Sequence, residues 1–244
     1  MRSTVSVFVA ALIGVATTIG AQTSNDAAAR VALALTPVGA LPPLITSTIQ
    51  GEAQHGAALA LRYGYLSGTR ALPDLNNFGA TAILPFGFGS TISLTGGVFS
   101  CDGCDTGLML SVGADKALGD TPLGSGREGS RLRFALNGEL GYGQPQHATF
   151  SSGSVISGYV GLPISLVSGS RARDEMRIVP FVTPGFGFGG VRGDNSASGT
   201  ALMIGGGVGI HNRSSSVALS FGFQHVAIEE SGTQIGLALV IGGR

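Results

Sequence analysis

The chain has 244 residues, of which 43% are hydrophobic and 11% are charged, and its formal net charge is zero. An ordinary soluble domain carries about a quarter charged residues, so this composition excludes a disordered polar chain and a protein that binds nucleic acid through its charge. Glycine is abundant, with 41 residues and no three-residue period, which argues against a helical bundle and excludes collagen.

Residues 1–21 have the features of a secretory signal peptide. Arg2 supplies a positive charge, residues 5–19 form an apolar run, and the small residues Gly20 and Ala21 precede the expected cleavage site. A membrane anchor needs about 20 apolar residues, and this run is shorter. We therefore expect an exported protein with a cleaved leader.

Two further regions follow the leader. Residues 22–48 are predicted to form an N-terminal periplasmic segment, in which Pro37, Pro42 and Pro43 interrupt regular structure. From residue 49 to residue 244 the sequence alternates with period two in short segments, separated by clusters of Gly, Ser, Asp, Asn and Pro. A period of two with internal glycines excludes helices and predicts one all-β domain.

Ten alternating segments are expected, and most have about the 9–11 residues that a tilted strand needs to cross a bilayer. One face of these segments carries Leu, Ile, Val and Phe, and the other carries mostly Gly, Ala and Ser. A face of small residues is more typical of a barrel lumen than of the water-exposed face of a soluble β-sandwich. The prediction is an up-and-down antiparallel transmembrane β-barrel of ten strands, with eight or twelve as alternatives. The segments are 58–65, 78–88, 91–99, 106–118, 131–143, 155–166, 177–188, 201–211, 217–224 and 234–241.

Aromatic residues gather toward one end of the predicted barrel. Most of them lie at the ends of the odd-numbered segments, and these ends share one rim in an up-and-down barrel. Such a rim of outward aromatics is typical of an interfacial girdle. The predicted girdle residues are Tyr63, Tyr65, Phe78, Tyr142, Phe186, Phe188, Phe221 and Phe223.

Four prolines lie within the predicted strands, where each removes a ladder hydrogen bond. A closed barrel has no free edge for them. We therefore expect Pro85, Pro163, Pro180 and Pro184 at rims or bulges.

The leader, the alternating segments and the glycine- and aromatic-rich stretches 180–189 and 205–209 resemble small outer-membrane β-barrel proteins of Gram-negative-type bacteria, OmpA-like or OmpW-like in the broad sense. The resemblance implies an outer-membrane location, contact with membrane lipid and insertion by the barrel-assembly machinery. Such barrels commonly end in an aromatic residue, whereas this sequence ends in Arg244.

The sequence offers little that indicates catalysis. Cys101 and Cys104 have the spacing of half a zinc site, but zinc needs four ligands, and we expect a small loop disulfide instead. His225 is followed by Glu229 and Glu230, yet no serine elbow motif accompanies them. We expect no enzyme activity and no metal or cofactor, and keep a barrel lipid hydrolase as an alternative.

Charged residues on the small-residue face predict a polar network in the lumen, centred on Arg62, Arg133 and Glu139. Arginine facing lipid near the midplane costs about 2–4 kcal/mol, and an unpaired buried charge is also costly. The expected function is therefore a structural or narrow passive-pore role. A secreted, soluble all-β binding or adhesion protein is the other alternative, and folding without detergent would identify it.

Overall fold

The computed structural model describes residues 56–67, 74–87, 89–101, 105–123, 129–146, 154–167, 176–192, 197–212, 217–227 and 232–242. Within these ranges, all regular structure is β-strand. The predicted signal peptide and the segment 22–48 lie outside the described residues. No helix in the described part of the chain is long and apolar enough to cross a membrane.

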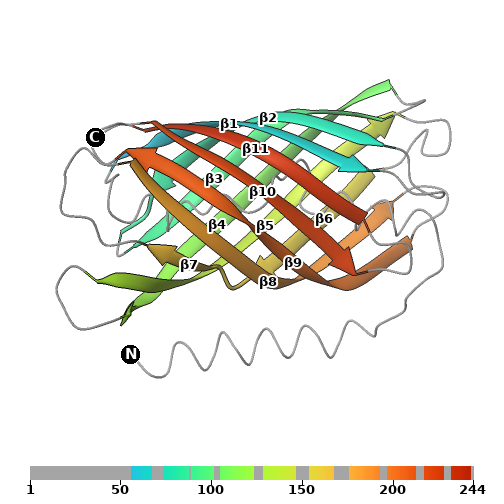
Figure 1. The fold of residues 1–244 in the computed structure, drawn as a ribbon. Helices are drawn as coiled ribbons and strands as arrows, with labels where there is room; N and C mark the ends of the chain where they lie inside the picture. The colour runs from blue at the N-terminus through green and yellow to red at the C-terminus, as the bar shows by residue number, and fades with distance from the viewer. Residues whose placement is uncertain are drawn as a thin grey trace.

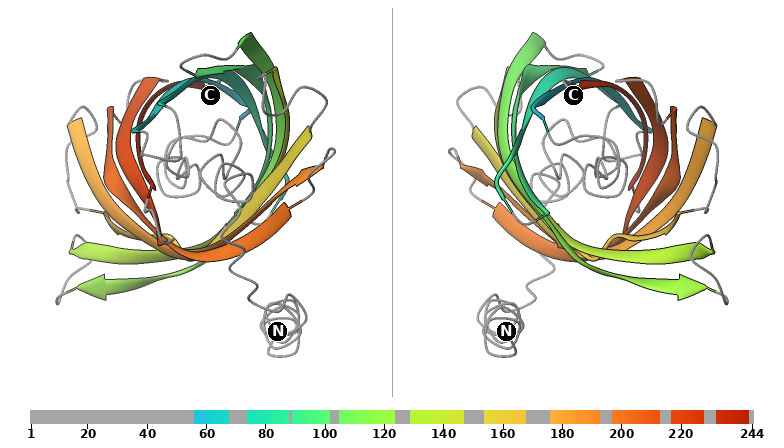
Figure 2. Two further views of the ribbon diagram at one scale, coloured as in Figure 1. Left: turned by 90° about the vertical axis from the view of Figure 1, so that its right-hand side faces the viewer. Right: turned by 90° about the vertical axis from the view of Figure 1, so that its left-hand side faces the viewer.

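Eleven strand segments form one antiparallel sheet that closes on itself (Figures 1 and 2). Apart from β6 and β7, each segment pairs with the next one along the chain, and β1 closes the ring with β11 from Ala58↔Gly242 to Ser67↔Thr233. The closed barrel confirms the all-β, up-and-down architecture. The strands are β1 Ala58–Ser67, β2 Leu75–Pro85, β3 Ser90–Cys101, β4 Asp105–Leu123, β5 Ser130–Gln146, β6 Ser154–Gly161, β7 Ile164–Val167, β8 Met176–Arg192, β9 Ala197–Asn212, β10 Val217–Ala227 and β11 Gly232–Gly242.

Strands β6 and β7 share one position in the wall. Both pair with β5 on one side and with β8 on the other. The described segments therefore make ten wall positions, which confirms the predicted strand number. The single segment expected at 155–166 is in fact interrupted at Leu162 and Pro163, because a proline has no N–H to continue the ladder.

Alternation along the strands sorts side chains into an outer and an inner face. On β1, Leu59 and Tyr63 are 48% and 45% exposed, whereas Ala60 and Arg62 are 0% and 2% exposed. The other strands follow the same rule within the ring, where Leu, Ile, Val and Phe dominate the outside, whereas residues 118–123 of β4 are all exposed. The inside holds small and polar residues together with a few buried apolar side chains.

The four strand prolines lie where a backbone donor is not needed. Pro85 ends β2, and Pro163 lies in the break between β6 and β7. Pro184 lies opposite that break, where its carbonyl accepts a hydrogen bond from Leu162 N at 2.9 Å. Pro180 lies in the part of β8 that pairs with β9 but, among the described residues, not with β7. All four agree with the expected rims and irregularities.

The β4–β5 hairpin extends beyond its neighbours. Pairing of β3 with β4 ends at Ser90↔Lys116, whereas β4 continues to Leu123 against β5. Figures 1 and 2 show this extension projecting away from the ring. Residues 119–123, which follow the expected segment 106–118, are therefore strand as well. A bulge between Ala117 and Gly119 shifts the register, and Gly119 has a φ of 155°, which favours glycine.

Candidate functional site in the barrel lumen

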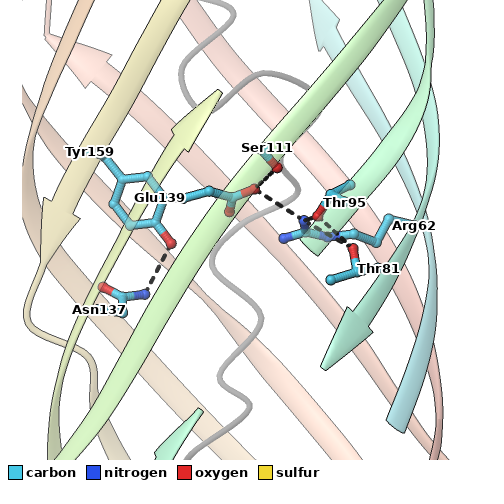
Figure 3. Close-up of polar contacts among 7 residues, drawn as sticks. All are labelled: Arg62, Thr81, Thr95, Ser111, Asn137, Glu139 and Tyr159. Carbon is cyan, nitrogen blue, oxygen red and sulfur yellow. Dashed lines mark hydrogen bonds and ion pairs between the residues drawn. The ribbon is translucent and has the colours of Figure 1, made fainter. Parts of the chain in front are cut away.

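Buried polar side chains meet at the centre of the lumen around Arg62 of β1 (Figure 3). Its Nη1 donates to Thr95 Oγ1 at 3.1 Å and to Thr81 Oγ1 at 3.3 Å. The same nitrogen lies 3.5 Å from Glu139 Oε1. Strands β1, β2, β3 and β5 thus all contribute to one charged centre.

The contact between Arg62 and Glu139, called the central pair below, crosses the lumen. Strands β2, β3 and β4 separate β1 from β5 along the wall, so the two side chains reach toward each other from different sides. Both side chains are buried, at 3% and 4% exposure. Glu139 Oε1 also accepts a hydrogen bond from Ser111 Oγ. Removing one partner of such a buried pair costs about 3–5 kcal/mol, because it leaves the other charge uncompensated.

A small cavity of about 20 Å³ lies beside the central pair. This volume holds about one water molecule. Below the central pair, Asn137 Nδ2 donates to Tyr159 Oη at 3.1 Å, which adds a second polar contact to the lining. The cavity is polar on most sides, and its lining includes Arg62, Thr81, Asp115, Asn137, Glu139 and Tyr159.

Arg133, the third residue of the predicted network, lies in a separate cluster. Its Nε and Nη2 donate to the two carboxylate oxygens of Asp120 at 2.8 and 3.0 Å. Arg131 Nη1 lies 4.0 Å from the same carboxylate. The structure thus brings Arg62 and Glu139 together and places Arg133 with Asp120 in the β4–β5 extension. The Arg133 bond lowers the pKa of Asp120, partial burial opposes this shift, and the positive charges of Arg133 and Arg131 lower the pKa further.

Sequence reasoning missed Asp120, because the bulge before it reverses which residues face inward. Continuing the alternation of β4 from Asp115 places position 120 on the outer face. After the register shift, Asp120 pairs with Arg133 and shares its inward face. Gly119 was the only signal of this irregularity in the sequence.

The predicted girdle residues lie on the outer face of their strands, and the girdle role itself stays a prediction. Tyr63 and Phe78 are direct cross-strand partners. Tyr63 Oη donates to Asn76 Oδ1 at 2.8 Å, and Tyr65 Oη donates to Asp74 Oδ2 at 2.9 Å. An apolar ring with a bonded hydroxyl is the arrangement expected where a barrel wall meets a membrane interface.

Two other predictions concern residues that lie partly outside the described part of the chain. Cys101 ends β3, but Cys104 is outside the described residues, so the disulfide stays a prediction. His225 Nδ1 lies 3.0 Å from Thr233 Oγ1 on the outer face, whereas Glu229 and Glu230 are not described. The hydrolase alternative is therefore untested.

No protein-family model and no curated protein matches the sequence. Among solved structures, the chain is similar to the outer membrane enzyme PagL, with 10% identity, a TM-score of 0.39, and coverage of 75% of this chain and 98% of that one. The chain is also similar to the N-terminal β-barrel domain of Pseudomonas aeruginosa OprF, with 11% identity, a TM-score of 0.33, and coverage of 78% of this chain and 98% of that one. For Ail, the attachment invasion locus protein of Yersinia pestis, the identity is 6%, the TM-score is 0.34, and the match covers 77% of this chain and 95% of that one. Function is therefore inferred from the residues of this chain.

Proposed function

We propose that the protein is an outer-membrane β-barrel with a structural role, whose lumen is closed to solutes by the central pair. The single observation that carries this proposal is the buried, cross-lumen contact of Arg62 and Glu139 inside a barrel with an apolar outer face. Its two parts, the membrane location and the closed lumen, are supported by different features.

The outer face supports the membrane location. Large apolar side chains are exposed at every wall position. Such a surface is unfavourable in water and favourable in contact with lipid. The interior, in contrast, contains the buried charged residues of the described wall. Outward residues of this kind include Leu61, Phe78, Leu94, Leu110, Leu140 and Phe221.

The places where backbone pairing ends indicate where the edge of the hydrocarbon layer lies. On the side of β3, the last described backbone partner of β4 is Gly89, whose carbonyl accepts from Ala117 N at 2.8 Å, and on the side of β7, β8 has no described partner before Phe181. Both unpaired edges occur at the same end of the barrel, where β4 ends and β8 begins. Unpaired backbone groups are not tolerated in hydrocarbon. We therefore place the Asp120–Arg133 cluster outside the membrane core.

The central pair supports a closed lumen. Its two side chains meet in the interior, and the adjoining cavity has room for about one water molecule. A solute larger than water would have to separate the pair and leave both charges buried. A narrow passive pore is the second candidate, and the charged, partly hydratable lining of that cavity favours it.

The test combines an assembly assay with a conductance assay on the full chain. We expect the protein to fractionate with membranes, to need detergent or lipid for folding, and to migrate differently on a gel before and after heating. In a planar bilayer, the wild type is expected to be silent, and the double variant Arg62→Ala/Glu139→Ala is expected to conduct small ions. The matched control Leu140→Ala changes only the outer face and should stay silent.

Different outcomes contradict different parts of the proposal. A folded monomer without detergent or lipid excludes the membrane barrel and favours a secreted soluble protein. Steady wild-type conductance in an assembled barrel excludes the closed lumen and favours the passive pore. Silence of the double variant in an assembled barrel shows that the central pair is not what closes the lumen.

A further inference from the structure

Beyond the central pair, buried side-chain oxygens lie along the lumen with no hydrogen-bond partner among the described residues. These atoms are Asn77 Oδ1, Asn137 Oδ1, Ser165 Oγ, Thr183 Oγ1 and Gln234 Oε1. Each of the five residues is at most 4% exposed. A buried acceptor or hydroxyl without a partner is destabilising, and proteins commonly satisfy such groups with internal water.

Three of these oxygens lie between the central pair and the β4–β5 extension. Asn137 and Thr183 both lie over Gly161, since a Cβ there would be 2.9 Å from Asn137 Oδ1 and 2.8 Å from Thr183 Cγ2. Ser165 is the register partner of Arg133, which binds Asp120 outside the membrane core. Polar atoms thus continue from the extension, past the β6–β7 break, to the central cavity.

The other two oxygens lie on the opposite side of the central pair. Asn77 Oδ1 covers Gly64, at 2.5 Å from the position that a Cβ would take. Gln234 pairs with Leu66 of β1, two residues from Gly64 on the same inner face. Gly64 itself pairs with Gly236, so no side chain of these two positions separates Asn77 from Gln234.

The central pair also offers a donor to this series. Arg62 Nε has no hydrogen-bond partner among the described residues, and Arg62 lines the 20 Å³ cavity. The residues around the cavity therefore combine a guanidinium, which donates, with the side-chain oxygens of Glu139 and Asn137, which accept. A single water molecule matches both its size and its mixture of donors and acceptors.

We propose that the lumen conducts water in single file and excludes ions, with the central pair as its narrowest point. A bare ion would have to lose its hydration shell to enter a cavity of this size, which is strongly unfavourable. The guanidinium and the carboxylate compensate each other, so the pair has no net charge that would replace the lost hydration of an ion of either sign. This inference rests on the proposed membrane barrel, and it replaces a general pore by a path that only water can take.

The test measures water and ion permeation on the same assembled barrel. Full-length protein is reconstituted into phosphatidylcholine–phosphatidylglycerol vesicles, and shrinkage in a sucrose gradient is followed by stopped-flow light scattering. We expect wild-type vesicles to shrink faster than empty vesicles, with no conductance in potassium chloride. Thr183→Val keeps the side-chain shape but removes the hydroxyl, and vesicles with this variant should shrink no faster than empty vesicles. Thr183→Ser should recover flux relative to Thr183→Val.

Two further variants keep the experiment informative if one substitution impairs folding. Ser165→Ala removes a second hydroxyl of the series and should also slow vesicle shrinkage. Leu140→Ala, on the outer face, should leave the shrinkage rate unchanged. The heat-modifiable gel band reports assembly in every sample.

Failure of the inference differs from failure of the proposed function. A wild-type chain that does not assemble in membranes overturns both. An assembled wild type without faster shrinkage, or with the same shrinkage in Thr183→Val and Ser165→Ala, overturns the water path alone. Ion conductance by the assembled wild type overturns its selectivity.

Discussion

Replacing Glu139 by Gln should destabilise the barrel because it removes the negative charge that lies 3.5 Å from the Arg62 guanidinium. The substitution keeps the shape of the side chain and an oxygen that can accept from Ser111 and Arg62. What changes is the charge in a site where both partners are at most 4% exposed. Breaking a buried pair costs about 3–5 kcal/mol when one charge remains. Since the hydrogen-bond geometry is kept, we expect about 3 kcal/mol, at the lower end of that range.

The assay is equilibrium unfolding of the full chain by urea in lipid vesicles, with the heat-modifiable gel band as the measure of folded protein. Ser111→Ala is the matched control, since it removes a hydrogen bond to the same carboxylate without changing any charge and should cost about 1.5 kcal/mol, the lower end for a hydrogen bond to a charged group. Adding Arg62→Met to Glu139→Gln removes both charges and should recover part of the loss. A Glu139→Gln loss no larger than that of Ser111→Ala would refute the reasoning, as would strict additivity in the double variant.

Two further predictions concern regions outside the central pair. The Arg133 bond depresses the pKa of Asp120 below its ordinary value of 3.8, so its contribution to stability is present above that value and is lost as the pH falls through the lower folded pKa. Urea unfolding from about pH 6 down to about pH 2 should therefore show a weaker acid dependence in Asp120→Asn than in the wild type, and identical profiles would contradict the role of this pair. Gly161→Ala should reduce assembly, because its Cβ would meet Thr183 and Asn137 at 2.8 and 2.9 Å, whereas Gly96→Ala, with its nearest atom at 3.7 Å, should be tolerated on the same gel assay. Equal assembly of the two glycine variants would contradict this prediction, because it would show that Thr183 and Asn137 can move to accept a Cβ at Gly161.

The strands and their two faces could be predicted from the sequence because both depend on a local property. A period of two places Leu59 and Arg62 on opposite faces whatever the neighbouring strands do. Repeated over ten segments of the length needed to cross a bilayer, this alternation also indicates a barrel. The prediction of Arg62 and Glu139 as inward charges follows from the same rule.

The contacts between strands could not be predicted in this way. Alternation gives the face of a residue but not its height in the barrel, so it did not show that Glu139 lies near Arg62 and that Arg133 does not. Thr81, Thr95 and Ser111 were missed for this reason, since they are ordinary small polar residues until the register aligns them.

Local irregularities were the other source of error. The bulge before Asp120 reverses the alternation, and the break at Pro163 divides one predicted segment into β6 and β7. Both arise where a glycine or a proline changes the backbone, and the sequence shows such residues without showing which of them interrupts a strand.

The cross-lumen position of the central pair has a consequence for the order of assembly. In a flat sheet, β1 and β5 would be about 19 Å apart, since each step between neighbouring strands is about 4.8 Å. Arg62 and Glu139 therefore meet only after the sheet has curled. Before that stage the two charges do not contact each other, and burying either of them alone would be unfavourable. The pair therefore stabilises the curved arrangement of β1 to β5 relative to a flat array of the same strands.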